Sequence, residues 1–600
     1  MSFQELQELA AEIRSYLLAH VSQTGGHLAS NLGVVELTIA IHNVFDTERD
    51  RLVFDVGHQS YVHKILTGRM DRFSSLRTYG GLAGFPKPSE SVHDAFTAGH
   101  ASSAVSAALG IARARTLSHE DYHVIAVVGD GAMTGGLFYE GMNDAGASHE
   151  PLIVILNDNG MSISKNVGGI SRHLSRVRLK PGYFGLKKLY RRLTRKLPGG
   201  RALYRFTHQI KDRLRQSLIG TTIFEEMGFL YLGPVDGHDI AKLSYLLARA
   251  KEENCPVLLH VITTKGKGYQ PAEETPSEYH GVGRFDPRSG LGCPSTDNFS
   301  SVFGQCLTGL AAEDPHICAI TAGMRSGTGL DAFALDYPSR FFDVGIAEGH
   351  AVSMAAGLAK QGMVPVFAVY STFLQRGYDM ILQDVALQQL HVVLCVDRAG
   401  LVGADGETHH GVFDVAYLRQ VPGMTVFAPA NYRELELMLR EAVLETEGPV
   451  AVRYPRGREG AYRSAPEKDC IRTGGDLTMV TYGTTVNAVL EAADRLAEQG
   501  VEAAVFKLRK LKPLDTGELF ASVRETGRLL VAEEVNQPGS ICEALSEALA
   551  EAGIPAQVCA CNLGDRYTTH GATDILEREA GLDAAGILRS AMEEWKLESE

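Results

Sequence analysis

Three features common in exported or membrane proteins are missing from this sequence. None of its apolar runs approaches the roughly 20 residues of a membrane-spanning helix. Its first residues, Met-Ser-Phe-Gln-Glu-Leu, include no basic and apolar leader. Nine cysteines are scattered over 600 residues, without a Cys-x-x-Cys pair or a zinc-ligand spacing. We therefore expect reduced thiols and a cytoplasmic protein.

An overall excess of positive charge is also missing. The formal net charge is −14, which argues for solubility and against general binding to nucleic acid. One segment departs from this pattern: from Arg172 to Arg215 there are fifteen Lys and Arg residues and a single acid, Asp212. A nucleic-acid patch would have this composition. We favour an exposed helical excursion that biases phosphorylated ligands toward a nearby cleft, because charged runs are usually solvated.

The chain does contain repeated alternation of apolar strands with helical patterns, which predicts an α/β fold of mostly parallel sheets flanked by helices. Its length implies several domains. Stretches rich in Pro, Gly and polar residues lie near 286–300 and 456–476. We therefore predict three domains, at 1–290, 300–457 and 475–600.

The most informative motif places polar side chains at the ends of two neighbouring strands. An apolar run over 124–128 leads into Gly129-Asp130-Gly131, a helix-compatible segment follows over 135–147, and a second apolar run over 152–156 ends in Asn157-Asp158-Asn159. Open α/β sheets bind ligands at the carboxyl ends of their strands. Oxygen ligands beside a phosphate are typical of Mg²⁺. A turn explains Gly-Asp-Gly alone, but the second strand favours a metal–diphosphate site belonging to a cofactor.

A short internal similarity supports two related domains. The segments 104–112 and 351–359 are identical at six of nine positions, and a Gly-His pair lies just before each. Small-residue helices are compositionally biased, so chance also explains the match. Two related α/β domains with a ligand between them would produce the same pattern.

Together, these motifs resemble thiamine-diphosphate enzymes, and most closely the 1-deoxy-D-xylulose-5-phosphate synthase family. The resemblance covers nearly the whole chain, is strong up to about Gly457 and is weaker beyond it. The motifs that carry it are Gly25-Gly26-His27-Leu28-Ala29-Ser30, Asp55-Val56-Gly57-His58-Gln59-Ser60-Tyr61, Gly129-Asp130-Gly131 with Asn159, Asp343-Val344-Gly345-Ile346-Ala347-Glu348, Tyr370-Ser371-Thr372-Phe373-Leu374-Gln375-Arg376, Asp397-Arg398-Ala399-Gly400, Gly403-Ala404-Asp405-Gly406 and Arg453-Tyr454-Pro455-Arg456-Gly457.

The resemblance implies a homodimer of three-domain subunits with a transketolase-like fold. It also implies a transferase that depends on thiamine diphosphate and Mg²⁺, and that condenses pyruvate with D-glyceraldehyde 3-phosphate as CO₂ leaves. The product would serve isoprenoid, thiamine and pyridoxal synthesis. In this family the site is expected between the first two domains of one chain.

For the cofactor, the resemblance assigns Asp130, Asn159 and the backbone carbonyl of Met161 as Mg²⁺ ligands. Ile163 would pack on the cofactor and Phe373 would stack on its aminopyrimidine, although apolar residues are more often ordinary core. Besides these residues and Glu348, the implied cofactor contacts are His58, His100, Ala101, Ser102, Gly131, Ala132 and Lys265.

Glu348 matches the family's glutamate, whose carboxylate lies beside N1′ of the aminopyrimidine and helps to generate the reactive carbanion. Its neighbours Ile346, Ala347 and Gly349 are uncharged, a setting that raises a carboxyl pKa. The carboxylate could also stabilise the N-terminus of a helix over 351–360. The two roles are compatible.

Four histidines in Gly-rich or loop contexts match family histidines that line the substrate channel: His27, His58, His280 and His409. Histidine titrates near neutral pH, which suits proton transfer. A phosphorylated aldehyde also needs a clamp, for which arginine offers bidentate donors. The positions that the family would use for this acceptor site are Tyr370, Arg376, Arg398, Asp405 and Arg456. Other histidines, such as His42 and His63, need no chemistry in their predicted helix or strand contexts.

Two positions depart from the family pattern and keep alternatives open. Gly349 stands where the family usually has Gln, and Gly160 stands where it usually has Glu. Both lie next to a proposed site residue, and glycine loosens the backbone. A catalytically impaired paralogue is therefore one alternative. A transketolase that moves two-carbon ketol units is another, which the Ala-Asp-Gly-Glu-Thr-His409 loop argues against.

Overall fold

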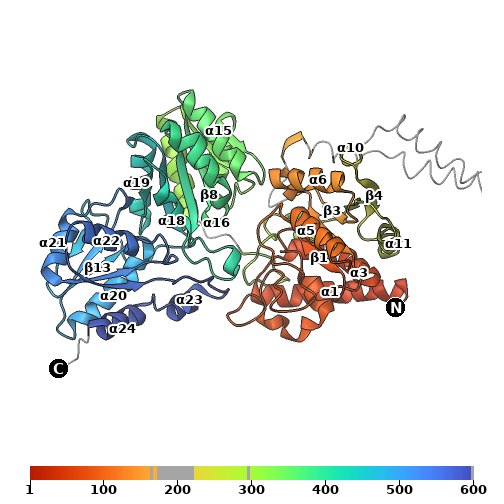
Figure 1. Ribbon diagram of the computed structural model, residues 1–600, viewed down its shortest axis with the longest axis horizontal. Coiled ribbons are helices and arrows are strands. Elements are labelled where there is room, and N and C mark those ends of the chain that lie inside the picture. The colour runs from red at the N-terminus through yellow and green to blue at the C-terminus, as the bar shows by residue number, and fades with distance from the viewer. Residues whose placement is uncertain (162–166, 170, 172–173, 175–221, 293–297, 596–600) are drawn as a thin grey trace, which may run out of the picture. The chain divides into compact units, whose positions relative to one another are not determined.

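The computed structural model describes residues 1–600 except 162–166, 170, 172–173, 175–221, 293–297 and 596–600 (Figure 1). Ile163 and almost all of the basic segment from Arg172 to Arg215 therefore lie outside the described residues. The chain forms two compact units. Unit 1 contains Met1–Val21, His27–Asp71 and Phe85–Val282, and unit 2 contains Ser22–Gly26, Arg72–Gly84 and Gly283–Glu600.

Unit 1 is built on a five-stranded parallel sheet with the order β1-β2-β3-β5-β4. Its strands are β1 Arg51–Phe54, β2 Val124–Gly129, β3 Ile153–Asp158, β4 Leu230–Asp236 and β5 Val257–Ile262. Its α-helices are α1 Phe3–Thr24, α2 Leu28–Leu32, α3 Val35–Val44, α4 Tyr61–Lys64, α5 Ala104–Leu117, α6 Gly136–Ser148, α10 Ile223–Glu226, α11 Ile240–Lys251 and α12 Gln270–Glu274.

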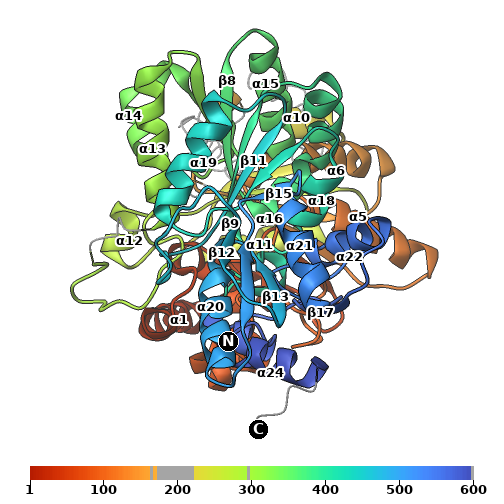
Figure 2. The ribbon, with the colours of Figure 1, turned by 90° about the vertical axis from the view of Figure 1, so that its left-hand side faces the viewer.

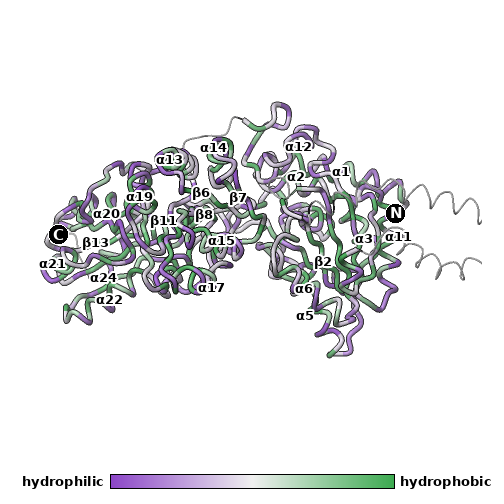
Figure 3. Tube along the Cα trace, turned by 90° about the horizontal axis from the view of Figure 1, so that it is seen from above, coloured by the Kyte–Doolittle hydropathy of each residue, from purple (hydrophilic) through white to green (hydrophobic). Residues whose placement is uncertain are grey.

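The apolar runs predicted as strands in this unit are β2 and β3, each within two residues of the predicted bounds. Both are almost completely buried, which explains why their sequences are continuously apolar instead of alternating. The predicted helix over 135–147 is α6, displaced by one residue. In Figure 3, segments coloured hydrophobic concentrate along the strands in the interior of the units.

Unit 2 contains two further sheets (Figure 2). The seven-stranded sheet has the order β15-β10-β11-β9-β8-β6-β7, and the five-stranded sheet has the order β12-β14-β13-β16-β17. Only β15 and β12 run antiparallel to their neighbours. The strands are β6 Ile317–Thr321, β7 Phe341–Asp343, β8 Val364–Tyr370, β9 Val393–Ala399, β10 Thr425–Phe427, β11 Val450–Pro455, β12 Cys470–Arg472, β13 Leu477–Thr481, β14 Ala503–Lys507, β15 Lys510–Lys512, β16 Arg528–Ala532 and β17 Gln557–Cys561.

Helices cover both sheets of unit 2 and supply their cores. Against the seven-stranded sheet, α13 and α19 contribute Phe303 and Met438 to one apolar cluster. Against the five-stranded sheet, α20 and α24 contribute Val489 and Ile587 to another. The α-helices are α13 Phe299–Glu313, α14 Asp331–Asp336, α15 Glu348–Lys360, α16 Ser371–Leu374, α17 Tyr378–Met380, α18 Asp414–Gln420, α19 Tyr432–Leu444, α20 Val486–Ala497, α21 Gly517–Thr526, α22 Ile541–Glu551, α23 Thr573–Glu579 and α24 Ala584–Trp595.

Among the strands that the sequence did not indicate, β12 and β15 are two of the shortest. The polar stretch 456–476 contains β12, which pairs with β14. Strand β15 follows β14 in the chain but joins the other sheet of unit 2, beside β10. Both are three residues long, too short to leave a pattern of alternating side chains. Among the described residues, no helix is long and apolar enough to cross a bilayer.

Candidate active site

The predicted metal ligands lie at the carboxyl ends of β2 and β3, which are adjacent and parallel. Gly129 pairs with Asn157, and the Asp130 N–H donates to the Asn157 carbonyl at 3.1 Å. The Asp130 side chain accepts a hydrogen bond from the Gly160 N–H at 2.7 Å. This contact holds the loop that carries Asn159 against the Asp130 carboxylate. Two strand ends that are remote in sequence therefore supply oxygen atoms to one region.

The Asn159–Met161 loop has a defined local geometry. The Asn159 side-chain oxygen accepts a hydrogen bond from the Met161 N–H at 3.0 Å. Gly160 has a φ of +78°, a conformation that glycine adopts without strain. Because this turn brings the Gly160 N–H onto Asp130, glycine at this position has a structural use. The available donors are one carboxylate, one carboxamide oxygen and one backbone carbonyl, a set that fits Mg²⁺.

The predicted diphosphate loop is fixed by Asp55, which directly follows β1. Asp55 accepts hydrogen bonds from the backbone N–H groups of Ser102 at 2.8 Å and Ala104 at 3.1 Å. The Ser102 hydroxyl donates to the Ala132 carbonyl at 2.7 Å. Ser102 is fully buried with a φ of +73°, so its backbone is held in a strained conformation. Predicted contacts at His100, Ala101, Ser102, Gly131 and Ala132 thus lie on two segments joined by this bond.

Lys265 supplies a buried positive charge to the same unit. Its side chain is 6% exposed, and its Nζ lies 3.2 Å from Nδ1 of His280. Burial lowers the pKa of Lys265 to about 8, although the negative charge of Asp130 opposes that change. An anionic group bound here would restore a higher pKa. A buried ammonium facing oxygen ligands fits a diphosphate–metal complex.

Three of the four predicted histidines form one cluster in unit 1, which we call the imidazole cluster: His27, His58 and His280. Their ring centroids are separated by 5.5 Å, 5.6 Å and 5.1 Å. Burial lowers the pKa of His280 well below its usual value, and the nearby Lys265, His58 and His27 lower it further. The His280 ring is therefore neutral at physiological pH, and one of its nitrogens can accept a proton.

Asn31 holds two members of the imidazole cluster, a role that was not predicted from the sequence. Its side-chain amide donates to the backbone carbonyls of His27 at 2.6 Å and His58 at 2.7 Å. Its side-chain oxygen accepts from the Tyr61 N–H at 2.8 Å. Asn31 is fully buried, one residue after the first histidine motif. In the sequence, only the place of Asn31 directly after the Gly-rich motif could have indicated this role.

In unit 2, Glu348 begins helix α15 and is 4% exposed. Burial raises the pKa of Glu348, whereas the guanidinium of Arg376, with a nitrogen 4.0 Å from the carboxylate, lowers it. Glu348 thus stands at the N-terminus of a helix, as predicted, and its burial favours the predicted rise of its pKa. Arg376, which the family resemblance assigns to the acceptor site, forms an ion pair with Glu348. Arg376 is therefore close enough to influence the pKa of the Glu348 carboxyl.

Gly349 is accommodated by the packing around α15. A Cβ atom at this position would lie 3.0 Å from Cε and 3.3 Å from Sδ of Met380. The flexible Met380 side chain therefore occupies the space that a larger residue at 349 would need. The helix continues unbroken from Glu348 to Lys360.

Aromatic and basic groups meet beyond the ends of β8 and β9. The Arg398 guanidinium lies 3.8 Å from the centroid of the Tyr370 ring. The Phe373 ring stacks on Tyr370 at 5.8 Å and meets the His409 ring edge-on at 5.6 Å. Phe373 and His409 are only partly buried, so they are not ordinary core residues. Arg398 has a φ of +59°, at a point where β9 departs from regular pairing with β11.

Arg77, which the sequence did not indicate as a site residue, contacts one of the residues predicted to bind the acceptor substrate. Arg77 forms an ion pair with Asp405 at 2.7 Å, and both side chains are less than a fifth exposed. Arg456 donates to the Val402 carbonyl at 2.8 Å and lies within electrostatic range of Arg398, Asp405 and Arg77. We call Arg77, Arg398 and Arg456 the guanidinium cluster. These three cations lie near two carboxylates, Asp405 and the buried Asp397, and the remaining positive charge suits a phosphate group.

Three family models match this chain in succession. Residues 1–263 match a model described as 1-deoxy-D-xylulose-5-phosphate synthase. Residues 297–459 match the pyrimidine-binding domain of transketolase, and residues 468–587 match the transketolase C-terminal domain.

Curated relatives match over almost the whole chain. A protein of Thermomicrobium roseum is 50% identical over 98% of this chain and 94% of its own length. Proteins of Heliobacterium modesticaldum and Pelotomaculum thermopropionicum are 48% and 47% identical, each over 99% of this chain and over 93% and 95% of their own lengths. All three are named 1-deoxy-D-xylulose-5-phosphate synthase.

Proposed function

The chain belongs to the 1-deoxy-D-xylulose-5-phosphate synthase family, and on that premise we propose that it condenses pyruvate with D-glyceraldehyde 3-phosphate as CO₂ leaves. It is a thiamine-diphosphate-dependent enzyme of the transketolase type. The observation that carries the proposal is the hydrogen bond from Gly160 to Asp130, which joins the loop of Asn159 to the carboxylate at the end of β2.

In unit 1, we assign Asp130, Asn159 and the Met161 carbonyl to Mg²⁺. Lys265 and the loop of His100–Ser102 would bind the diphosphate. The buried ammonium of Lys265 neutralises phosphate charge, and Asp55 keeps the loop in its strained conformation. Mg²⁺ is proposed from the oxygen donors present, since these are the ligands that it prefers.

In unit 2, Glu348 would contact N1′ of the aminopyrimidine and Phe373 would stack on that ring. When bound, thiamine diphosphate supplies a nucleophilic carbon and an electron sink for decarboxylation. The raised pKa of Glu348 suits a carboxyl that shares a proton with a ring nitrogen, because burial weakens its preference for the charged form. The positive charge of Arg376 opposes that effect, because it lowers the pKa of the same carboxyl.

For the substrates, the imidazole cluster would hold or pass protons, and the guanidinium cluster with Tyr370 would bind the aldehyde's phosphate. A neutral His280 carries one N–H, which could donate to a developing alkoxide, and one lone pair, which could accept a hydrogen bond in return. Arginine presents paired donors of fixed geometry, which match phosphate oxygens. His409 lies against Phe373 and is proposed for the acceptor side of the reaction.

The test supplies purified protein with thiamine diphosphate, Mg²⁺, pyruvate and the aldehyde phosphate. We expect 1-deoxy-D-xylulose 5-phosphate, identified by mass, and faster CO₂ release when the aldehyde is present. Replacing pyruvate with a ketose phosphate should yield no transfer product. Ketol transfer from that donor would instead indicate a transketolase, and binding without any turnover would indicate an impaired paralogue.

Assembly and location complete the proposal. We propose a homodimer, as the family resemblance implies, and a cytoplasmic location, as the sequence composition suggests. Sedimentation of the full chain should give the mass of two subunits. A stable monomer with full activity would contradict the first of these statements.

A further inference from the structure

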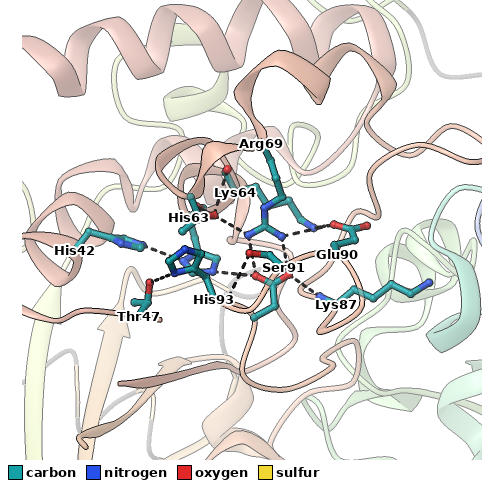
Figure 4. Close-up of polar contacts among 11 residues, drawn as sticks. His42, Thr47, His63, Lys64, Arg69, Lys87, Glu90, Ser91 and His93 are labelled. Atoms are coloured by element: carbon teal, nitrogen blue, oxygen red, sulfur yellow. Dashed lines mark hydrogen bonds and ion pairs between the residues drawn. The ribbon is translucent and has the colours of Figure 1, made fainter. Parts of the chain in front are cut away.

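A buried polar network in unit 1 lies outside the residues assigned above (Figure 4). Its centre is the Asp94 side chain, which is completely buried. Asp94 accepts hydrogen bonds from Nε2 of His63 at 3.0 Å, from the two terminal nitrogens of Arg69 at 2.7 and 2.8 Å, and from the backbone N–H of Lys87 at 2.8 Å. One carboxylate thus joins three segments of the chain.

The charges in this network balance. Lys64 is fully buried and donates to Glu90 at 2.6 Å, and Arg69 is paired with Asp94. Two cations therefore face two carboxylates, so that a further charge would be costly at this depth. His63 is accordingly neutral, in agreement with the lowering of its pKa by burial.

A neutral His63 fixes the direction of the hydrogen bonds. Its Nε2–H donates to Asp94, so its Nδ1 carries a lone pair and accepts from Nε2–H of His42, 2.9 Å away. The hydrogen-bonded series His42–His63–Asp94 links helix α3 to helix α4 and to the segment around Asp94. Substitution of His63 would remove one of the hydrogen-bond donors to Asp94 and would leave a buried cavity in place of the ring.

The joined segments flank predicted cofactor contacts. His63 and Lys64 close helix α4, which begins three residues after His58. Asp94 lies six residues before His100, in the segment that leads to Ser102. The bond from Lys87 to Asp94 closes this segment into a loop. The network therefore anchors the chain at Asp94, six residues before the His100–Ser102 loop, while Asp55 holds Ser102 itself.

We propose that Asp94, held by His63 and Arg69, is a positioning residue that sets the orientation of the His100–Ser102 loop and thereby the affinity for a diphosphate. This inference rests on the proposed function, because it takes that loop as a cofactor contact. It adds a role for residues that touch neither the cofactor nor a substrate. The effect should appear in cofactor binding rather than in the rate of the loaded enzyme.

The test compares His63→Leu, His63→Gln and Asp94→Asn in the full-length protein. Calorimetry measures the Kd for thiamine diphosphate with Mg²⁺, thermal unfolding checks the fold, and kinetics at saturating cofactor give kcat. The loss of one hydrogen bond to a charged group corresponds to about tenfold or more in an equilibrium constant, so we expect about a tenfold rise in Kd for His63→Leu and Asp94→Asn. His63→Gln keeps an N–H at the position of Nε2 and should recover most of the affinity. In each folded variant, kcat should stay within about twofold of the wild type.

Asp144→Asn is the matched control, because Asp144 forms an exposed ion pair with Arg113 in the same unit. If His63→Leu folds and binds thiamine diphosphate as tightly as the wild type, the positioning role is wrong. If Asp94→Asn fails to fold, His63→Leu and its Gln counterpart still decide the question. If the wild type itself does not bind thiamine diphosphate, the proposed function fails first, and that outcome is distinct from equal binding by all variants.

Discussion

The imidazole cluster of unit 1 and the guanidinium cluster of unit 2 solve different electrostatic problems. In unit 1, burial keeps His280 neutral beside a buried Lys265, and an uncharged amide, Asn31, holds the cluster in place. In unit 2, the three arginines of the guanidinium cluster are permanently charged, Arg77 pairs with Asp405, and Arg456 is exposed to solvent. Proton transfer needs groups that can be neutral, whereas phosphate binding needs charge that cannot be lost.

Because proton transfer needs a group that can change its charge, we expect the largest loss of activity from a substitution at Glu348, whose carboxylate must be able to exchange a proton. Glu348→Gln keeps the shape and removes the titrating group, so kcat should fall by about 10²- to 10⁴-fold. Steady-state kinetics measures this change, and circular dichroism checks the fold. Glu313→Gln, which removes an exposed carboxylate paired with Arg440, is the control and should leave kcat unchanged. Retained turnover in Glu348→Gln would contradict the role of this residue.

The guanidinium cluster should affect substrate binding more than turnover. Hydrogen bonds to charged groups contribute about 1.5–3 kcal/mol, so Arg398→Ala should raise the KM for the aldehyde phosphate by about 10- to 150-fold. The KM for pyruvate should change much less, because pyruvate carries no phosphate. Equal changes in both constants would show that Arg398 acts through the fold. Arg433→Ala, at an exposed position, provides the comparison.

Substitution of Asn31 tests whether the hydrogen bonds from its uncharged side chain are needed to hold the imidazole cluster. Asn31→Ala removes three hydrogen bonds, to His27, His58 and Tyr61, and leaves buried backbone groups unpaired. We expect the free energy of unfolding to fall by about 1–3 kcal/mol, with a loss of kcat. Denaturant unfolding and steady-state kinetics measure the two effects. Asn43→Ala, at an exposed site, should change neither; a fully active Asn31→Ala would show that the clamp is dispensable.

The smallest effect concerns the pH dependence of stability. His42 lines an open cavity of about 390 Å³, and burial, with the nearby His63, His93 and Arg69, lowers its pKa from 6.5 to about 3. Below pH 6.5 the unfolded chain therefore binds a proton that the folded chain does not, and stability falls as the pH falls from 6.5 toward 3. At pH 5.5 the loss should be about 1.4 kcal/mol.

His42→Gln removes the titrating ring and keeps an N–H that can donate to His63. Denaturant unfolding at pH 5.5 and pH 8 should therefore show a smaller pH dependence for His42→Gln than for the wild type. An unchanged pH dependence would mean that His42 is already protonated in the folded protein. His316→Gln, at an exposed histidine, is the control.

The sequence predicted those parts of the site that depend on strand order. Continuous apolar runs identified β2 and β3, and the carboxyl-edge rule brought Asp130 and the Asn159 loop together. The glutamate at the start of α15 was likewise predicted with its raised pKa. Each strand and the start of the helix is marked by its own short run of residues, and the rule for parallel sheets supplies the contact between the strand ends.

Residues whose role depends on distant contacts could not be predicted. Arg77 lies more than 300 positions before Asp405, and nothing in its own segment indicates that pairing. Asn31 and Asp55 act on backbone groups, which carry no sequence signal. Strand β15 joins a sheet other than that of its neighbour in the chain because its partner, β10, is chosen by tertiary packing.

The most direct test of the account is a calorimetric titration of thiamine diphosphate, with and without Mg²⁺, into the wild type and Asp130→Ala. The account predicts saturable binding by the wild type only when Mg²⁺ is present, loss of that binding in Asp130→Ala, and unchanged binding in Asp144→Asn. Tight binding by Asp130→Ala, or by the wild type without any divalent cation, would contradict the claim that oxygens at the ends of β2 and β3 hold a metal–diphosphate complex.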